Sequence, residues 1–273
     1  MPELPEAETV ARYLDGELAR QTFERVLHLR PDMVRGGARR LRKNLSRAHV
    51  QRVVRRGKRV VLELDRSRVL IIALGMTGHL RVTPHDELVE PHTHLRVLLA
   101  DGRELRLRDV RRFGWIEYAD KPSGGNGVGL GALGVEPLEM SLGQLVELMS
   151  RRRQVKALLM DQRAIAGLGN IYCDEVLHRS GIHPLQTAAA VPAAQVRRLH
   201  RAIRQILNAA IRANGSTIDS YLSPSGGPGS YQGRHRVYGR TGQPCWQCGG
   251  TIVRITAAGR STHYCPKCQP LDT

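Results

Sequence analysis

The sequence predicts an α+β fold: an antiparallel β-sandwich with one flanking helix, followed by a helical region and a small β-hairpin between two cysteine pairs. Three observations support this prediction. Apolar residues at three- and four-residue spacing indicate a helix over residues 5–18. Segments with a period of two residues follow over residues 22–119, and helical periodicity returns between residues 141 and 213.

The first helix carries signals that place its N-terminal end. Pro5 suits the first helical position, and the acidic residues Glu6 and Glu8 suit the positive end of the helix dipole. Pro2 and Glu3 are therefore expected just before the helix. The apolar face consists of Ala7, Val10, Ala11, Leu14 and Leu18.

Six short segments rich in β-branched and apolar residues predict the strands of the sandwich. Asp101-Gly102, between two of these segments, is typical of a two-residue hairpin turn. The predicted strands are residues 23–29, 51–55, 59–65, 69–74, 94–100 and 104–108.

Four helices are predicted in the second half of the chain. Ser141 is expected to cap the first of them, and Pro192 is expected in the first turn of the last. The turn at residues 167–169 puts Asn170 and free backbone N–H groups at a helix start, which is an anion-binding geometry. The ordinary alternative is that Asn170 caps the helix. The four helices are residues 141–150, 154–160, 170–179 and 192–213.

Two glycine-rich segments interrupt these elements. Residues 121–137 combine glycines with proline and are expected to form a flexible hinge. A phosphate-cradling loop is the alternative, but no Lys-Ser or Lys-Thr pair follows the glycines. Residues 223–234 are expected to be a linker or a mobile loop that closes over a ligand.

The charge balance indicates a polyanionic partner. The chain has 42 Lys and Arg residues against 25 Asp and Glu residues, a net charge of +17 and a pI near 10.6. Nucleic acid is the commonest polyanion inside cells. No stretch of eighteen apolar residues suits a membrane span, and no secretory h-region is present. We therefore expect an intracellular protein that binds nucleic acid.

Four cysteines near the C-terminus have the C-x2-C-x16-C-x2-C spacing of a zinc site with four thiolate ligands. A pair of disulfides is the alternative, which an intracellular chain disfavours. A hairpin of residues 251–255 and 261–264 is predicted between the pairs and would hold Arg260 against a phosphate; a solvated surface arginine is the alternative. The four cysteines are Cys245, Cys248, Cys265 and Cys268.

The N-terminus is a candidate for chemistry. If Met1 is removed, Pro2 carries a free secondary amine beside Glu3. An α-amino group has a pKa of about 7.7 to 8.0, so part of it is neutral near neutral pH. Such an amine can attack a sugar carbon. Since most N-termini do no chemistry, the alternative is an ordinary helix start.

Two further segments suit insertion into DNA. Met76 lies between glycines, and Phe113, one of only two phenylalanines, follows Arg111 and Arg112. Side chains of these types can enter between base steps and fill the space left by an extruded nucleotide. Each could instead be a core residue.

Together these features resemble the bacterial formamidopyrimidine-DNA glycosylase family over essentially the whole chain. Cys173 departs from the family pattern, because an aliphatic residue is expected after Tyr172; we expect Cys173 to be buried and inert. The six motifs that carry the resemblance are Met1-Pro-Glu-Leu-Pro-Glu6, Arg56-Gly-Lys58, Leu74-Gly-Met-Thr-Gly78, Arg111-Arg-Phe-Gly114, Gly167-Leu-Gly-Asn-Ile-Tyr172 with Asp174-Glu175, and Gly259-Arg-Ser-Thr-His-Tyr-Cys265.

The resemblance implies a bifunctional DNA glycosylase and AP lyase of base-excision repair. Such an enzyme removes 8-oxoguanine and formamidopyrimidines from duplex DNA through an N-terminal proline Schiff base and β,δ-elimination. The resemblance also implies one structural zinc ion, a DNA partner with oxidised bases or abasic sites, a monomer, and a cytoplasmic location at the nucleoid. The implied domains are a catalytic β-sandwich (2–120), the hinge (121–137), a helix-two-turns-helix domain (138–222), a lesion-covering loop (223–234) and a zinc finger (235–273).

The same resemblance implies roles for individual residues. Pro2 would attack C1′ of the damaged nucleotide, Glu3 would act as general acid and base, and Glu6 would order the site. Lys58 and Arg260 would complete the catalytic set by holding phosphates beside the extruded nucleotide. Other DNA contacts would come from His92, Arg112, Asn170 and Lys156, and the void would be filled by Met76, Arg111 and Phe113.

Two alternatives remain open at this point. The endonuclease eight group, which prefers oxidised pyrimidines, looks similar at Pro2 and Glu3 but usually differs at Leu4 and in the void-filling residues. A comparison of 8-oxoguanine with thymine glycol as substrates separates this group from the purine enzymes. The other alternative is a non-catalytic protein that binds damaged DNA, which would need neither the amine nor Glu6; binding without strand cleavage would support it.

Overall fold

The computed structural model describes residues 2–120, 130, 132–217 and 227–271. Most of the predicted hinge and the first part of the predicted lesion-covering loop lie outside these residues. The chain forms two compact units. The first, here called the β unit, comprises Met1–Ala132 with Asn214–Gly229, and the second, the helical unit, comprises Leu133–Ala213 with Ser230–Thr273.

The β unit contains two sheets and the N-terminal helix α1 (Leu4–Leu18). The four-stranded sheet has the order β1-β7-β8-β6, and the five-stranded sheet has the order β2-β9-β5-β4-β3. All neighbouring strands are antiparallel except the short parallel pair of β2 and β9. The elements are β1 (Phe23–Leu29), η1 (Pro31–Met33), β2 (Val34–Arg35), α2 (Ala38–Leu45), β3 (Val50–Arg56), β4 (Arg59–Leu64), β5 (Arg68–Ala73), β6 (Gly78–Pro84), β7 (Thr93–Leu99), β8 (Arg103–Asp109) and β9 (Trp115–Asp120).

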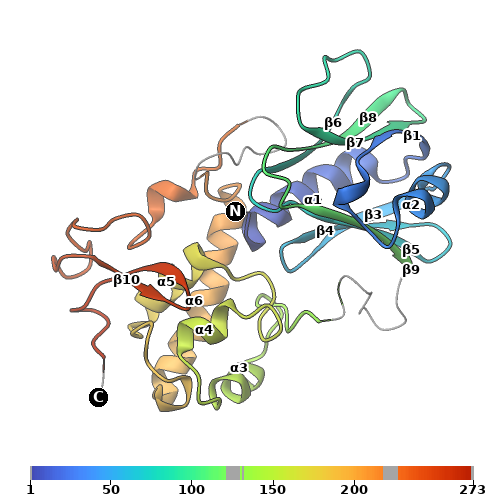
Figure 1. Ribbon diagram of the computed structural model, residues 1–273. Helices are drawn as coiled ribbons and strands as arrows, with labels where there is room; N and C mark the ends of the chain where they lie inside the picture. Colours follow the sequence, from blue (N-terminus) through green and yellow to red (C-terminus); the bar gives the residue numbers. More distant parts are fainter. Residues whose placement is uncertain (1, 121–129, 131, 218–226, 272–273) are drawn as a thin grey trace. The chain divides into compact units, whose positions relative to one another are not determined.

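One apolar core joins both sheets to the helices. Helix α1 packs against β3 and β4 of one sheet and β6 of the other (Figure 1). Leu14 and Leu18 of α1, Leu62 of β4 and Leu107 of β8 belong to a single buried cluster. Because this cluster draws on both sheets and both helices, α1 is fixed to the β unit from Val10 to Leu18.

The predicted strands are confirmed to within one residue at each end, and α1 begins one residue earlier than predicted. The predicted turn between β7 and β8 is also confirmed, since Gly102 has a φ of +84° that favours glycine. Besides the short η1, four elements of the β unit were not predicted. The helix α2 is only eight residues long and buries only Leu41 and Leu45, and β2 spans two residues. Strand β6 begins at Gly78 and β9 begins directly after Gly114, and glycines are typical of turns.

The helical unit contains α3 to α6 and a two-stranded hairpin (Figure 1). Helix α6 packs against α3 and α5, and α5 also contacts α4 and β11. The four helices and the hairpin belong to one compact unit. The elements are α3 (Leu142–Met149), α4 (Val155–Met160), α5 (Asn170–Ser180), η2 (Ala188–Ala190), α6 (Ala193–Arg212), η3 (Tyr231–Arg234), β10 (Val253–Ala257) and β11 (Arg260–Tyr264).

The helix ends test two sequence predictions. Ser141 caps α3 as predicted: its hydroxyl accepts the N–H of Gln144, whose side chain accepts the N–H of Ser141. Pro192 was predicted inside the first turn of α6, but it occupies the N-cap position with an extended ψ of 143°. The prediction was wrong by one position. Proline at the N-cap loses no helical hydrogen bond, because the N–H of an N-cap residue has no partner within the helix.

No helix in the described part of the chain is long and apolar enough to cross a membrane.

A buried carboxylate in β8 organises the loop that follows β6. Glu104 is fully buried and accepts hydrogen bonds from Arg96 and Arg106, and its carboxylate also contacts His85. Arg106 in turn donates to the carbonyl groups of Leu88 and Glu87 in that loop. Burial raises the pKa of Glu104, but the hydrogen bonds from its basic neighbours outweigh this and lower the pKa to about 2.

Glu104 should make the stability of the β unit depend on pH. Its pKa is lower in the folded state than in the unfolded chain, so its contribution is complete above pH 4.5 and is lost as the pH falls toward 2. We expect this loss to be about 3 kcal/mol of unfolding free energy. Urea unfolding followed by Trp115 fluorescence in a Trp246→Phe background would measure it. A Glu104→Gln variant should lack this dependence; an equal decline in both proteins would contradict the prediction.

Candidate functional site

The N-terminal residues lie against a buried carboxylate at the start of α1. Pro2, Glu3 and Glu6 are all buried. Glu3 is the N-cap of α1, and its N–H donates to Oε2 of Glu6 at 2.8 Å. The other oxygen of Glu6 accepts the N–H of Ser216 at 2.8 Å. One carboxylate thus fixes the backbone of Glu3 and attaches the segment after α6 to it.

Gly215 lets the backbone before Ser216 approach the carboxylate of Glu6 closely. Its φ is +79°, and an added Cβ would lie 2.6 Å from Oε1 of Glu6. A side chain at this position would therefore push the segment away from Glu6. Sequence reasoning missed Gly215 and Ser216 because they are 209 and 210 residues from Glu6 in the chain, and an Asn-Gly pair after a helix is a common stop signal.

Lys58 lies in the turn between β3 and β4, and this turn is tied to α1. Arg55 donates to Oε2 of Glu8 in α1 at 2.9 Å and to the carbonyl oxygen of Gly57 at 3.1 Å. The side chain of Arg55 is only 8% exposed, so this bridge is shielded from solvent. The β unit therefore places Lys58 and the N-terminus by way of the same helix.

The predicted void-filling residues lie on two turns that touch. Gly75 has a φ of +62°, and an added Cβ would lie 2.5 Å from the backbone nitrogen of Gly114. Phe113 is 56% exposed, and the guanidinium of Arg111 lies 4.6 Å above its ring. Phe113 is therefore not a core residue, and the structure brings the turn of Met76 together with the turn of Arg111 and Phe113.

His92 and Arg112 lie at the surface of the same β unit. Both are exposed non-glycine residues with positive φ, +66° and +53°. The carbonyl oxygen of His92 accepts the N–H of Asp109, and Arg112 donates to Asp32 at 3.1 Å. The pair of Arg112 with Asp32 is exposed on both sides, so it is easily exchanged for a phosphate.

Asn170 and Arg260 are neighbours in the helical unit. Gly169, not Asn170, is the N-cap of α5, so the alternative that Asn170 caps the helix is wrong. The side-chain amide of Asn170 donates to the carbonyl oxygen of Ser261 at 2.8 Å. Arg260 is the preceding residue of β11, and the turn before it, at Ala258 and Gly259, has positive φ values of +51° and +69°. The first strand of this hairpin begins two residues later than predicted.

The structure contradicts the predicted DNA contact of Lys156. The residue was assigned to DNA contact, but its side chain is fully buried. Its ammonium donates to Asp174 at 2.6 Å and to the hydroxyl of Thr262 at 2.7 Å. Asp174 also accepts the backbone N–H of His263 at 2.8 Å. Lys156 therefore cannot reach a phosphate; it links α4, α5 and β11 and so supports the hairpin that carries Arg260.

Glu175, next to Asp174, is a second buried acid without a role assigned from the sequence. Its carboxylate accepts the backbone N–H groups of Arg236, Val237 and Tyr238 at 2.8 to 3.0 Å. Burial raises the pKa of Glu175, against the effect of these three donors. The signal was present as two adjacent acids in the middle of α5, but the partners of Glu175 come from more than 60 residues away.

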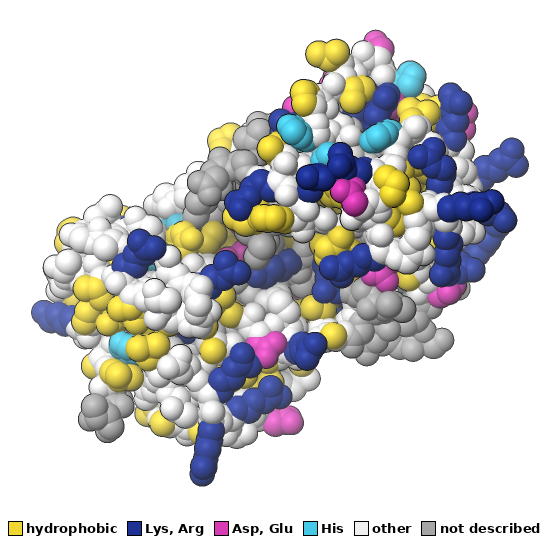
Figure 2. All heavy atoms as spheres, in the orientation of Figure 1, with side chains coloured by type: hydrophobic (Ala, Val, Ile, Leu, Met, Phe, Trp, Pro, Cys, Tyr) yellow, Lys and Arg dark blue, Asp and Glu magenta, His cyan; other side chains and the backbone are white. Residues whose placement is uncertain are grey.

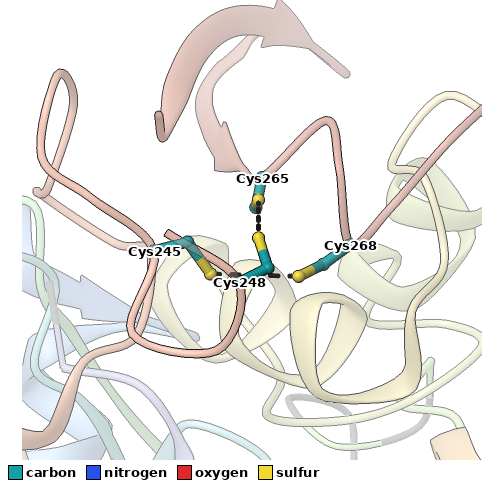
Figure 3. A group of neighbouring side chains, drawn as sticks. All are labelled: Cys245, Cys248, Cys265 and Cys268. Carbon is teal, nitrogen blue, oxygen red and sulfur yellow. Dashed lines mark hydrogen bonds between the residues drawn. The ribbon is translucent and has the colours of Figure 1, made fainter. Parts of the chain in front are cut away.

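The four cysteines converge at the base of the hairpin (Figure 3). Their sulfur atoms lie within 4.8 Å of one another, with 3.9 Å between Cys245 and Cys268 and 3.4 Å between Cys248 and Cys265. Zn–S bonds of about 2.3 Å in a tetrahedron place sulfur atoms about 3.8 Å apart. The donor set therefore fits zinc, and four thiolates leave no open coordination position. Cys173 lies elsewhere and is fully buried, as predicted.

Basic side chains outnumber acidic ones on one face of the molecule. Figure 2 shows many Lys and Arg side chains and few Asp and Glu on the face drawn. This distribution agrees with the net charge of +17 and suits contact with a polyanion.

Sequence models of three domains match three parts of the chain. The formamidopyrimidine-DNA glycosylase N-terminal domain matches residues 1–116, and the formamidopyrimidine-DNA glycosylase H2TH domain matches residues 133–221. A zinc finger found in FPG and IleRS matches residues 242–271.

Individual proteins are similar over the full length. The formamidopyrimidine-DNA glycosylases of Bacillus cereus and Heliobacterium modesticaldum are 38% and 41% identical, with at least 98% of each chain covered. The crystal structure of the MutM (FPG) protein of Thermus thermophilus has a TM-score of 0.88 at 38% identity, covering 100% of both chains. Lactococcus lactis Fpg in complex with DNA containing an abasic site has a TM-score of 0.89 at 34% identity, covering 98% and 99%.

Breaking the buried pair of Lys156 and Asp174 should destabilise the helical unit. In a Lys156→Met variant Asp174 stays buried but loses its cation, so we expect a loss of about 3 to 5 kcal/mol of unfolding free energy. Urea unfolding followed by Trp246 fluorescence in a Trp115→Phe background would measure it. The matched control is Arg153→Met, which removes the partly exposed pair with Asp161 and should cost below about 1 kcal/mol. Equal costs in the two variants would contradict the assignment.

Proposed function

Because this chain belongs to the formamidopyrimidine-DNA glycosylase family, we propose that Pro2 and Glu3 carry out its chemistry. The enzyme is a DNA glycosylase with AP lyase activity that acts in base-excision repair of oxidised purines. The observation that carries the proposal is the buried carboxylate of Glu6, which holds the backbone of Glu3 beside Pro2. A prolyl amine fixed in this way can be aligned with one sugar carbon.

The proposed reaction starts at the Pro2 nitrogen, after removal of Met1. Its lone pair forms a bond to C1′ as the glycosidic bond breaks, and the amine proton would pass to the departing base, which leaves in its neutral form. Glu3, in its acid form, would protonate O4′ as the sugar ring opens, which leaves an iminium ion between Pro2 and C1′. Glu6 keeps Glu3 in place and takes no proton in this scheme.

The iminium ion then supports two eliminations. Its positive charge acidifies C2′, so loss of a C2′ proton breaks the C3′–O bond and releases the 3′ phosphate. In a second elimination, loss of the C4′ proton breaks the C5′–O bond and releases the 5′ phosphate, leaving a gap of one nucleotide. The carboxylate of Glu3, formed when Glu3 gives its proton to O4′, would accept the C2′ proton.

The remaining assigned residues would bind DNA. Lys58, Asn170 and Arg260 would hold phosphates beside the extruded nucleotide, and His92 and Arg112 would add weaker phosphate contacts. Met76, Arg111 and Phe113 would fill the space left in the duplex. Arg111, Arg112, Phe113, His92 and Arg260 are exposed, and Lys58, Met76 and Asn170 are partly exposed, which supports these assignments.

We also propose that the four cysteines bind one zinc ion with a structural role. The ion would hold the base of the hairpin, and the hairpin would hold Arg260. The enzyme is expected to act as a monomer on nucleoid DNA in the cytoplasm. The pyrimidine-preferring alternative is not adopted, because the named relatives are formamidopyrimidine-DNA glycosylases.

Replacing the nucleophile should abolish the covalent intermediate. With a duplex containing 8-oxoguanine, borohydride should trap a protein–DNA adduct with the wild-type enzyme and at least a hundredfold less with Pro2→Gly, because glycine lacks the ring that fixes the amine. The matched control is Pro5→Ala, which changes a proline of the same segment inside α1 and should still be trapped. Wild-type trapping yields with Pro2→Gly would contradict the assignment.

Zinc removal should affect DNA binding while the β unit stays folded. Elemental analysis should find one zinc per chain. Removal with a chelator should weaken binding to an abasic-site duplex by at least tenfold, because the hairpin that carries Arg260 loses its base. Trp115 fluorescence should stay unchanged, which reports an intact β unit. Full DNA affinity in protein with less than about a tenth of its zinc would contradict a structural role.

A further inference from the structure

A buried carboxylate in the β unit has no place in the chemistry described above. Asp109 is fully buried at the end of β8, and no cation lies within ion-pair distance of it among the residues that the structure describes. The ring of His94 contacts the backbone carbonyl oxygen of Asp109 at 3.0 Å, not the carboxylate. An unpaired buried carboxylate costs free energy unless hydrogen bonds compensate, so its donors indicate what it does.

The donors come from the two turns that carry the void-filling residues. One oxygen of Asp109 accepts the hydroxyl of Thr77, and the other accepts the backbone N–H of Gly114 at 2.8 Å. The hydroxyl oxygen of Thr77 accepts the backbone N–H of Arg111 at 3.0 Å. Asp109 and Thr77 therefore hold the turn of residues 109–114 at Arg111 and at Gly114, on either side of Phe113.

Close packing leaves these turns no room to shift. An added Cβ on Gly114 would lie 2.6 Å from the carbonyl oxygen of Ala73 and 3.0 Å from the carboxylate of Asp109. The turn of residues 74–78 is closed by the N–H of Gly78 on the carbonyl oxygen of Leu74 at 2.8 Å. The two turns thus form one body, from which Phe113 projects with Arg111 stacked on its ring.

We propose that Thr77 and Asp109 are positioning residues that hold Arg111 and Phe113 in the geometry required to enter the duplex. The proposal rests on the proposed function of those two residues in the space left by the extruded nucleotide. A side chain that enters a base step from a fixed turn does not lose conformational freedom on binding, whereas one on a loose turn does. Loosening the turn should therefore reduce kcat/KM, although the Asp109 carboxylate and the Thr77 hydroxyl bond to groups within the protein.

Thr77→Val tests this with little change in shape. The valine keeps the branched side chain but removes the acceptor of the Arg111 N–H and the donor to Asp109. We expect kcat/KM for an 8-oxoguanine duplex to fall about tenfold, and Thr77→Ser, which keeps the hydroxyl, to restore it to within twofold. Asp109→Asn is a second variant that should act in the same direction. The matched control is Thr22→Val, which removes a threonine contact to His49 elsewhere in the β unit and should change kcat/KM less than twofold.

A double-mutant comparison separates positioning from general damage. In an Arg111→Ala, Phe113→Ala background nothing remains to be positioned, so adding Thr77→Val should cost less than twofold more. Thermal unfolding of each variant reports whether the β unit stays folded. A tenfold effect of Thr77→Val that persists in this background, or no effect in the wild-type background, would overturn the proposal. A wild-type enzyme without excision activity would instead contradict the proposed function.

Discussion

The interaction on which the active end of the molecule depends is the pair of hydrogen bonds accepted by Glu6. Its two oxygens hold the N–H groups of Glu3 and Ser216, and the carboxylate is almost completely buried. A backbone amine has no side chain of its own through which it can be aimed. Its direction is set by the residues that follow it, so the start of α1 must be rigid for Pro2 to work. Glu6 supplies that rigidity, and the core beneath α1 supplies the support.

Buried charge is used in the same way in both units. Glu6 and Asp109 in the β unit, and Asp174 and Glu175 in the helical unit, are acids whose partners lie on segments far away in the chain or on a neighbouring turn. Each carboxylate accepts hydrogen bonds with a defined direction, which apolar contacts cannot impose. Burying these carboxylates costs free energy. Their hydrogen bonds fix the position of a turn or hairpin that carries a residue for binding or chemistry.

Much of the fold was predictable because its signals are local. The period of α1, the strand segments, the Ser141 cap and the cysteine spacing each depend on residues close together in the chain, and the structure confirms them. The features that the sequence did not reveal depend on contacts between residues that are far apart in the chain. Lys156 looked like a surface cation because burial of a lysine depends on Asp174 and Thr262, and neither partner is local to it. Strands β6 and β9 were missed because the glycines before them, which permit close contact of two turns, resemble ordinary loop residues.

The central claim is that a backbone amine at the start of α1 is the nucleophile, and the site of covalent attachment tests it most directly. The enzyme would be reduced with borohydride on a duplex containing 8-oxoguanine, digested with trypsin, and the peptide that carries the nucleotide sequenced by mass spectrometry. The account predicts an adduct on Pro2, in the peptide from Pro2 to Arg12, with Met1 absent. An adduct on an internal lysine, such as Lys58, would contradict it.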